Sequence, residues 1–314
     1  MGWKLGVEKS NNSQSVSTEL TKENPKSNQQ VQFVAVSPKY TLNDILVSPK
    51  VFTDLNTIIQ AKSCWDLIFN QWGLSYVMKE KQNLMINLYG QPGTGKTMSA
   101  HAIAHELNKK IICVNYADIE SKYVGETSKN LTELFNYAQQ NDYIIFFDEA
   151  DALLSKRVTN MSNATDVSVN QTRSVLLTLL NDYTGMVIFA TNFITNYDSA
   201  FMRRIQYHVE FELPDIEVRE LLWKKYIPKQ MPTNVNVSRL SNDFANISGS
   251  DISNAVLKAS LYAASNKYDL VEHSFFEDAI KNIIKAKNSN DCKYMTTTTK
   301  NVTEEYALSQ INKN

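Results

Sequence analysis

The sequence predicts an α/β fold with a five-stranded, mostly parallel sheet, followed by a small all-helical domain. Two observations support this prediction. Before Pro214, short continuous apolar runs of strand length alternate with longer runs of helical spacing, as in a sheet covered by helices on both faces. After Pro214, apolar residues recur at helical spacing and strand-like runs stop.

The predicted elements follow one another along the chain. Apolar runs at 84–89, 111–115, 143–147, 186–190 and 209–213 have the length and continuity of buried strands. Helical spacing is found at 51–72, 95–107 and 129–140, and again around 175–180 after a polar stretch at 157–170. In the second domain, helices are predicted at 218–226, 252–264 and 275–287, with Ser250 and Asp251 as N-cap candidates for the middle one.

This order divides the chain into a disordered N-terminal segment (1–38), an α/β domain (39–213), a helical domain (214–287) and a disordered tail (288–314). Both end segments are rich in polar residues such as Asn, Lys and Thr, and such segments cannot bury enough apolar surface to offset their ordering entropy. Trp3, Leu5 and Val7 alternate near the start, which fits either a short docking peptide or a frayed terminus.

Composition limits the possible functions. The formal net charge is −1, so the overall balance gives no support for non-specific nucleic-acid binding. The first residues lack the apolar core of a secretion signal, and we find no apolar run of eighteen residues, so we expect no membrane insertion. Cys64, Cys113 and Cys292 are widely spaced and form no metal or redox motif. A cytoplasmic location is the simplest expectation.

A glycine-rich turn follows the first predicted strand and opens a helix. It matches G-x-x-x-x-G-K-[ST] at every fixed position through Gly90, Gln91, Pro92, Gly93, Thr94, Gly95, Lys96 and Thr97. Glycines let successive backbone N–H groups point inward at phosphates, and the helix N-terminus favours negative charge. Lys96 supplies a cation for the β- and γ-phosphates, and the Thr97 hydroxyl can bind Mg²⁺. We therefore predict a site for ATP and Mg²⁺ that extends to Met98.

Two acidic residues end the third predicted strand. Asp148 is placed to hold Mg²⁺ through its water shell, and Glu149 to polarise the water that attacks the γ-phosphate. Favourable capping of the next helix would explain the two charges, but not their place after a buried strand downstream of a phosphate loop.

Further polar candidates follow. Asn192 ends the fourth predicted strand, where its amide could orient the attacking water or sense the γ-phosphate. Arg203 and Arg204 lie between the fourth and fifth strands, and can be surface charges or arginine fingers that stabilise the transferring phosphoryl group. His101 and His105 lie four residues apart, but Ala102 stands where the zinc-protease pattern needs Glu, so we interpret them as packing or surface residues.

These motifs together carry a resemblance to a family. Segments 90–97, 146–149, 189–192, 198–204, 213–215 and 248–251 occur in the order and regions seen in AAA+ ATPases. More narrowly, they resemble the classic AAA group that includes katanin, spastin and the proteasomal ATPases. The resemblance covers roughly residues 40–287, and it implies a P-loop NTPase domain followed by a helical lid.

The resemblance also implies roles for further residues. Asp44 and Ile45 correspond to the family's adenine-contacting segment, and Gly249 and Ser250 match the lid motif that meets the adenine from the other side. Lys122, Tyr123 and Val124 resemble the pore loop, whose aromatic residue grips an extended polypeptide in the centre of a hexameric ring. A tyrosine suits this task because it is a stiff, amphipathic contact.

The sequence departs from the family pattern at some positions. Gln91 replaces a usual proline at a variable position of the loop, so nucleotide binding is not put in doubt. Counted back from Pro214, Arg204 aligns with the first arginine finger, while the second falls on Tyr207, so the finger role is assigned to Arg203 and Arg204 as a pair. Asn170 and Gln171 stand where many relatives carry paired arginines, which leaves the signalling between subunits open.

The sequence thus predicts a Mg²⁺-dependent ATPase that forms a homo-oligomeric ring, expected to be a hexamer, and that remodels, unfolds or disassembles a protein partner. We expect no nucleic-acid partner. Two alternatives stay open at this point: a nucleotide-dependent switch or loader acting on a nucleic-acid complex, and a scaffold that binds ATP with little hydrolysis. The aromatic pore loop and the nearly balanced net charge argue against the first alternative. The intact set of Lys96, Asp148 and Glu149 argues against the second.

Overall fold

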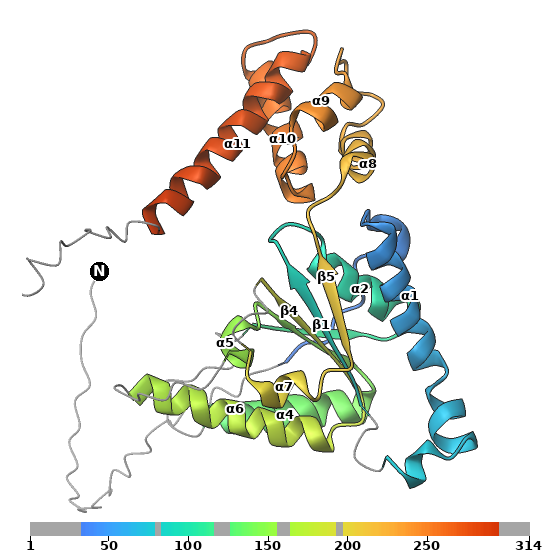
Figure 1. The fold of residues 1–314 in the computed structure, drawn as a ribbon. Helices are drawn as coiled ribbons and strands as arrows, with labels where there is room; N and C mark the ends of the chain where they lie inside the picture. Colours follow the sequence, from blue (N-terminus) through green and yellow to red (C-terminus); the bar gives the residue numbers. More distant parts are fainter. Residues whose placement is uncertain (1–32, 79–82, 116–125, 156–163, 193–196, 295–314) are drawn as a thin grey trace, which may run out of the picture. The chain divides into compact units, whose positions relative to one another are not determined.

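Five parallel strands form one sheet in the order β2-β3-β4-β1-β5 in the computed structural model (Figure 1). The strands are β1 (Leu84–Gly90), β2 (Ile111–Asn115), β3 (Ile144–Asp148), β4 (Met186–Thr191) and β5 (Tyr207–Phe211). The structure describes residues 33–78, 83–115, 126–155, 164–192 and 197–294. The predicted α/β class and five-stranded sheet are confirmed, and every pairing among these strands is parallel.

The fifth strand differs from its prediction. It covers Tyr207–Phe211 rather than 209–213. Within the described residues, β5 pairs with β1 alone, and the last pair joins Gly90 to Phe211. Because β1 ends at Gly90, the residues after Phe211 have no strand to pair with, although their alternation of apolar and acidic side chains continues the pattern of the strand.

Helices cover both faces of the sheet (Figure 1). On one face, α1 (Pro49–Ser63) and α2 (Lys96–Glu106) pack against Leu84, Ile86 and Leu88 of β1. On the other face, α4 (Glu126–Asn141) and α6 (Ala164–Asp182) pack against Phe147 and Phe189. The central strands are therefore buried on both sides, which explains why their sequences are continuously apolar.

Shorter elements complete the α/β part. They are the helical turns η1 (Leu42–Asp44), η2 (Leu67–Gln71) and η3 (Leu74–Tyr76), and the short helices α5 (Asp151–Leu154) and α7 (Ser199–Met202). The chain enters this part before the predicted boundary at residue 39, since Val36 exchanges two backbone hydrogen bonds with Ile111, at 2.9 and 3.0 Å. Helix α6 begins at Ala164, within the stretch that its polarity marked as irregular.

Four helices follow β5 and surround a core of their own. They are α8 (Ile216–Tyr226), α9 (Val237–Asp243), α10 (Gly249–Ser265) and α11 (His273–Tyr294), and Trp223, Leu240 and Phe276 are fully buried among them. The short helix α9 was not predicted, and α11 continues past residue 287, where the tail was expected to begin. The boundaries of the domains otherwise stay a prediction.

The start of α10 corrects a second prediction. Its N-cap is Ser248, not Ser250 or Asp251, and Asp251 is the third helical residue. The Ser248 hydroxyl accepts from the Asp251 N–H at 3.3 Å, and the Asp251 carboxylate accepts from the Ser248 N–H at 2.7 Å. This capping box satisfies two backbone donors at once, and it fixes the first turn of the helix.

Buried Arg219 joins α8 to the segments on either side of it. Its guanidinium donates to the Ser241 carbonyl through Nε and Nη2, at 3.1 and 3.0 Å, and to the Pro214 carbonyl through Nη1, at 2.7 Å. The helical part is thus tied at Pro214, where the chain leaves the sheet. None of the helices in the described ranges has the length and apolar character that a membrane span needs.

Candidate active site

The phosphate loop connects β1 to α2 with three glycines in backbone conformations that other residues rarely adopt. Gly90, Gly93 and Gly95 have φ of 134°, 76° and 104°. A Cβ on Gly90 would lie 2.1 Å from the Phe211 carbonyl oxygen, and a Cβ on Gly93 would lie 2.7 Å from the Ser248 hydroxyl. Glycine is therefore required both by the turn itself and by the close approach of β5 and α10.

Lys96 is the first residue of α2 and is buried at the base of the loop. Its Nζ donates to the carbonyls of Gly90 and Gln91, at 2.7 and 2.9 Å, and to Asn192 Oδ1 at 3.1 Å. Burial lowers the pKa of Lys96, while the nearby carboxylates of Asp148 and Asp151 act in the opposite direction. The ammonium group is thus held where the loop, the end of β4 and the acidic residues meet.

The acidic pair lies beside Lys96 and Thr97. Thr97 Oγ1 donates to Asp148 Oδ2 at 3.0 Å, so the hydroxyl and the carboxylate already face each other. The Glu149 N–H donates to the other Asp148 oxygen at 3.0 Å, and Glu149 has φ of 50°, a left-handed conformation that is costly for this residue type. An oxygen-only pair at the end of a strand, next to a phosphate loop, fits the ligand preference of Mg²⁺.

Asn192 is positioned by a residue that sequence reasoning missed. The Asn192 N–H points at both carboxylate oxygens of Asp151, each 3.3 Å away. Asp151 opens α5, and the adjacent Ala150 N–H donates to the Ala190 carbonyl at 2.9 Å. The acidic loop after β3 is thus fastened to the end of β4. The sequence signal that could have identified Asp151 was its position, three residues after Asp148 in the first turn of a short helix.

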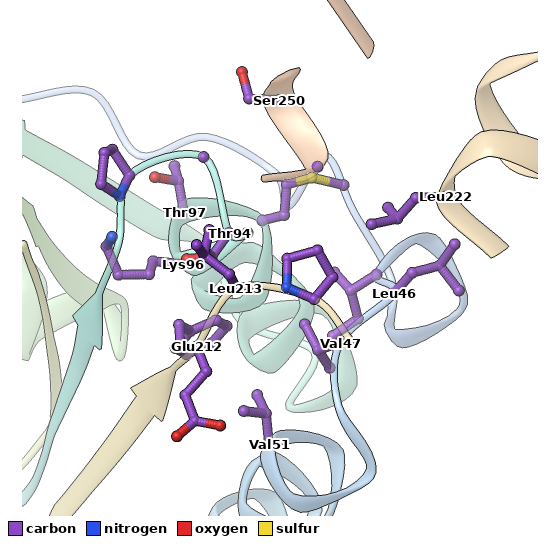
Figure 2. A pocket seen from close by; sticks show the side chains of 18 of the residues that line it. Leu46, Val47, Val51, Thr94, Lys96, Thr97, Glu212, Leu213, Leu222 and Ser250 are labelled. Carbon is purple, nitrogen blue, oxygen red and sulfur yellow. The ribbon is translucent and has the colours of Figure 1, made fainter. Parts of the chain in front are cut away.

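These groups line one cavity of about 450 Å³ (Figure 2). Of the predicted nucleotide-binding residues, the structure places the following on its wall: Asp44, Ile45, Pro92, Gly93, Thr94, Gly95, Lys96, Thr97, Met98, Asp148, Glu149, Asn192, Gly249 and Ser250. Gly90 and Gln91 do not line it; their carbonyls hold Lys96 instead. The contacts between the α/β and helical parts lie within one compact unit of the chain.

The two ends of the cavity differ in chemistry. In Figure 2, Lys96 and Thr97 lie on the side of the phosphate loop, and Leu46, Val47 and Leu222 lie on the opposite side. The second end is an apolar slot; for the adenine end the resemblance implied Asp44, Ile45, Gly249 and Ser250. The wall of the cavity also includes Val51, Phe211, Leu213, Pro214, Val218, Tyr226 and Ser253. A polar end and a flat apolar end match the phosphates and the base of a nucleotide.

Two hydrogen bonds link the helical part to the α/β part around the cavity. The Ser250 N–H donates to the Gly93 carbonyl at 3.2 Å, and Lys225 Nζ donates to the Asp44 carbonyl. The Asp44 carboxylate accepts from the Thr41 N–H and hydroxyl, at 2.8 and 2.9 Å. The hydrogen bond from that N–H is the main reason why the pKa of Asp44 is lowered. Lys225 was not predicted, because it reaches the site only through the packing of α8.

Arg203 and Arg204 both lie outside the cavity wall. Arg204 is half-buried, and its guanidinium donates to Asn181 Oδ1 of α6 and to the Ala200 carbonyl, both at 2.8 Å. Arg203 is exposed and contacts its own helical turn, through Nε to the Ser199 carbonyl at 3.3 Å. The structure therefore separates the pair into an anchored arginine and an exposed one.

The remaining predicted sites have different outcomes. The pore-loop residues Lys122, Tyr123 and Val124 lie outside the described residues. His101 is buried with Nε2 3.7 Å from Cys113 Sγ, whereas His105 is exposed. Among the described residues, no cluster of three or more His, Cys, Asp or Glu side chains is arranged to hold a metal ion by itself.

The sheet order, the phosphate loop and the paired acids define a P-loop nucleotide-binding domain. The family model described as "ATPase family associated with various cellular activities (AAA)" matches residues 86–213. These residues form an AAA ATPase domain, and the resemblance to the classic AAA group is confirmed.

Known proteins support the same family. The chain is 36% identical to cell division protein C of Sulfolobus acidocaldarius over 194 residues. The aligned region covers 59% of this chain and 51% of that protein. It is 34% identical over 208 residues to the 26S proteasome regulatory subunit 8 homolog of Saccharomyces cerevisiae, covering 63% and 50%. It is 31% identical over 226 residues to the ATP-dependent zinc metalloprotease FtsH of Lachnoclostridium phytofermentans, covering 69% and 39%. The chain thus matches about half, or less, of the length of these relatives.

Proposed function

We propose that this chain is a Mg²⁺-dependent ATPase that assembles head-to-tail into a ring, taken to be a hexamer, and remodels a protein partner threaded through the pore. The observation that carries the proposal is the single cavity where Lys96, Asp148, Glu149 and Asn192 meet at one end and an apolar slot forms the other. The proposal places the protein in the cytoplasm, and it includes neither nucleic-acid binding nor membrane insertion.

The residues at the polar end divide the work of hydrolysis. Lys96, released from the loop carbonyls, would bind the β- and γ-phosphates. Thr97 and Asp148 would hold Mg²⁺, which when bound neutralises phosphate charge. Glu149 would accept a proton from the attacking water while Asn192 orients that water, as the P–O bond to ADP breaks. The Asn192 side-chain oxygen already accepts from Lys96, and its backbone N–H donates to Asp151, so Asn192 is held in place before substrate arrives.

Among the described residues, no arginine lines the cavity, which supports completion of the site by a neighbouring subunit. Of the two candidates, Arg203 suits this role better, because Arg204 is anchored to α6 and to its own helix. A finger from the next subunit requires a heterologous interface, which forms a ring when the rotation between subunits closes. Arginine fingers are typically worth about 10³-fold or more in rate.

Threading is supported by the Lys122–Val124 pore motif and by the names of two relatives, a proteasome regulatory subunit and an ATP-dependent metalloprotease. We therefore propose an extended polypeptide as the substrate in the pore, gripped by Tyr123.

The test measures ATP turnover against protein concentration, with and without an unstructured polypeptide. Turnover per subunit is expected to rise with concentration and to fall steeply in Arg203→Ala. Stimulation by the polypeptide, expressed relative to each protein's own basal rate, is expected in the wild type and lost in Tyr123→Ala. Tyr76→Ala is the control, because Tyr76 is 82% exposed and does not line the nucleotide cavity. Turnover that is flat with concentration would contradict the ring, and equal stimulation of both tyrosine variants would contradict threading.

A further inference from the structure

Three polar side chains lie together inside the apolar core between the sheet and helices α4 and α6. Asn87 of β1, Thr191 of β4 and Tyr197 have exposed fractions of 0%, 1% and 6%. Tyr197 OH donates to Thr191 Oγ1, and Thr191 Oγ1 donates to Asn87 Oδ1 at 3.4 Å. We refer to these residues as the Tyr197 cluster. Its surroundings are aromatic, with Phe147, Phe189 and Phe201 in the same core.

Burial dominates the chemistry of this cluster. It raises the pKa of Tyr197 to about 12, although hydrogen bonds with Thr191 and Asn87 act to lower it. The phenol is therefore protonated at every physiological pH and acts as a fixed hydrogen-bond donor. Polar groups in an apolar core are costly unless they are paired, so the three side chains hold one another in place.

The cluster connects the nucleotide site to the helix that precedes the arginines. Thr191 is followed by Asn192, whose Oδ1 accepts a hydrogen bond from Lys96 Nζ at 3.1 Å. Tyr197 is followed by Asp198, the N-cap of α7, whose carboxylate accepts from the Ala200 N–H at 2.8 Å. Helix α7 ends at Met202, so Arg203 is its first residue beyond the C-terminus.

A second set of bonds holds the start of α7 from the side of the acidic loop. The Asp198 N–H donates to the Leu154 carbonyl at 2.8 Å, and Tyr197 pairs with Ser155 through the backbone. These bonds need no particular side chain at 197. The hydroxyl of Tyr197 adds the link to β4, which is the strand that ends at Asn192.

We propose that Tyr197 is a positioning residue for Arg203: its hydroxyl, through Thr191, fixes helix α7 relative to the end of β4. Strand β4 then aligns the arginine that its subunit offers to the neighbouring subunit. The residue after this strand, Asn192, contacts Lys96 in the nucleotide site of its own subunit. This inference rests on the proposed function, because it requires that Arg203 act in a neighbouring site.

The test removes only the hydroxyl, with Tyr197→Phe. Tyr183→Phe is the matched control, because Tyr183 is 4% exposed on the same face of the sheet and its hydroxyl donates to the Tyr143 carbonyl at 2.9 Å, away from the site. Tyr197→Phe is expected to lower the ATP turnover of the homo-oligomer about ten- to a hundredfold while nucleotide affinity is unchanged, as a misaligned catalytic group would. Tyr183→Phe is expected to keep its turnover.

Mixed assemblies locate the defect. Glu149→Gln subunits offer an intact Arg203 but cannot hydrolyse, so mixing them with Arg203→Ala subunits should restore turnover; this mixture tests the proposed function. Mixing Glu149→Gln with Tyr197→Phe should likewise restore turnover, because the Tyr197→Phe site then meets an intact arginine. Glu149→Gln/Tyr197→Phe mixed with Arg203→Ala should stay low, because every arginine offered is misaligned.

The outcomes separate the two ideas. If the first mixture shows no recovery, the trans arginine is wrong and the inference falls with the proposed function. If the first mixture recovers but the second does not, the Tyr197 defect lies in its own site and the inference is wrong. Equal turnover of Tyr197→Phe and Tyr183→Phe also overturns it. Asn87→Leu/Thr191→Val/Tyr197→Phe, which removes all three polar groups, is expected to regain stability but not turnover; regained turnover would show that the cluster serves packing alone.

Discussion

Replacing Gly93 with alanine tests how the phosphate loop and the helical part meet. Gly93 has φ of 76°, and an added Cβ would lie 2.7 Å from both Ser248 Oγ and Ser250 Cβ. Ser250 Cβ is fixed to the backbone of α10, and Ser248 is the N-cap of that helix. The new methyl group would therefore have to displace the first turn of α10, or break its capping box.

The expected cost has two parts. A left-handed backbone costs an alanine roughly 1–2 kcal/mol. Loss of an N-cap costs roughly 0.5–2 kcal/mol more. Gly95→Ala provides the control, because Gly95 has φ of 104° and nothing lies within 4 Å of its added Cβ. That variant carries the backbone strain without the clash, so Gly93→Ala should be the less stable of the two by about 1 kcal/mol.

The assay is urea unfolding of the nucleotide-free protein, so that effects on ligand binding do not enter. A double-mutant cycle with Ser250→Gly isolates the clash, because it removes one of the two atoms that the methyl group meets. In the Ser250→Gly background, the excess cost of Gly93→Ala over Gly95→Ala should shrink. If the two alanine variants are equally stable, or if the excess survives Ser250→Gly unchanged, the contact between Gly93 and α10 does not exist as described.

Three further predictions concern groups around the site and its supports. Lys225→Met removes the donor to the Asp44 carbonyl and should weaken nucleotide binding by about two- to fivefold, the worth of one exposed hydrogen bond. Lys224→Met is the control, because the Lys224 ammonium donates to Glu220 on the surface; its nucleotide titration curve should be unchanged. Arg219→Lys cannot reproduce a guanidinium that spans two carbonyls, so urea unfolding should show a loss of about 2–3 kcal/mol; a loss below about 1 kcal/mol would contradict the buried fork. Burial, and after it the charge of Lys39, lowers the pKa of His101 below its ordinary 6.5, against the opposing charge of Asp148. The unfolded chain then binds the proton more readily, so stability should decline as pH falls from about 7, and His101→Gln should flatten that decline; parallel slopes for both proteins would rule this out.

The parts of the site that sequence alone could predict are those whose chemistry is local. Gly93, Lys96 and Thr97 are close together in the sequence, so one loop brings them together. Asp148 ends a strand whose length and continuous hydrophobicity mark it as central in the sheet. Because carboxyl ends of parallel strands share one edge of the sheet, the position of Asn192 after a predicted strand was enough to place it beside them.

The parts that could not be predicted depend on packing between distant segments. Lys225 reaches Asp44 only because α8 leaves the sheet at Pro214 in one direction, which no local pattern encodes. Helix α6 begins at Ala164, inside the polar stretch at 157–170, so polarity was a misleading guide to where that helix begins. The Ser248 cap is different, since its [ST]-x-x-[DE] spacing with Asp251 was readable in the sequence.

The walls of the cavity belong to two different cores. Among the apolar wall residues, Val51 and Phe211 are part of the core around β1 and α2, whereas Val218 and Leu222 are part of the separate core of α8–α11. Between the walls, the bonds from Ser250 to Gly93 and from Lys225 to Asp44 are single and partly exposed, and such bonds are worth little each. A nucleotide that fills both ends contacts both cores at once, so its binding energy also holds the cores together.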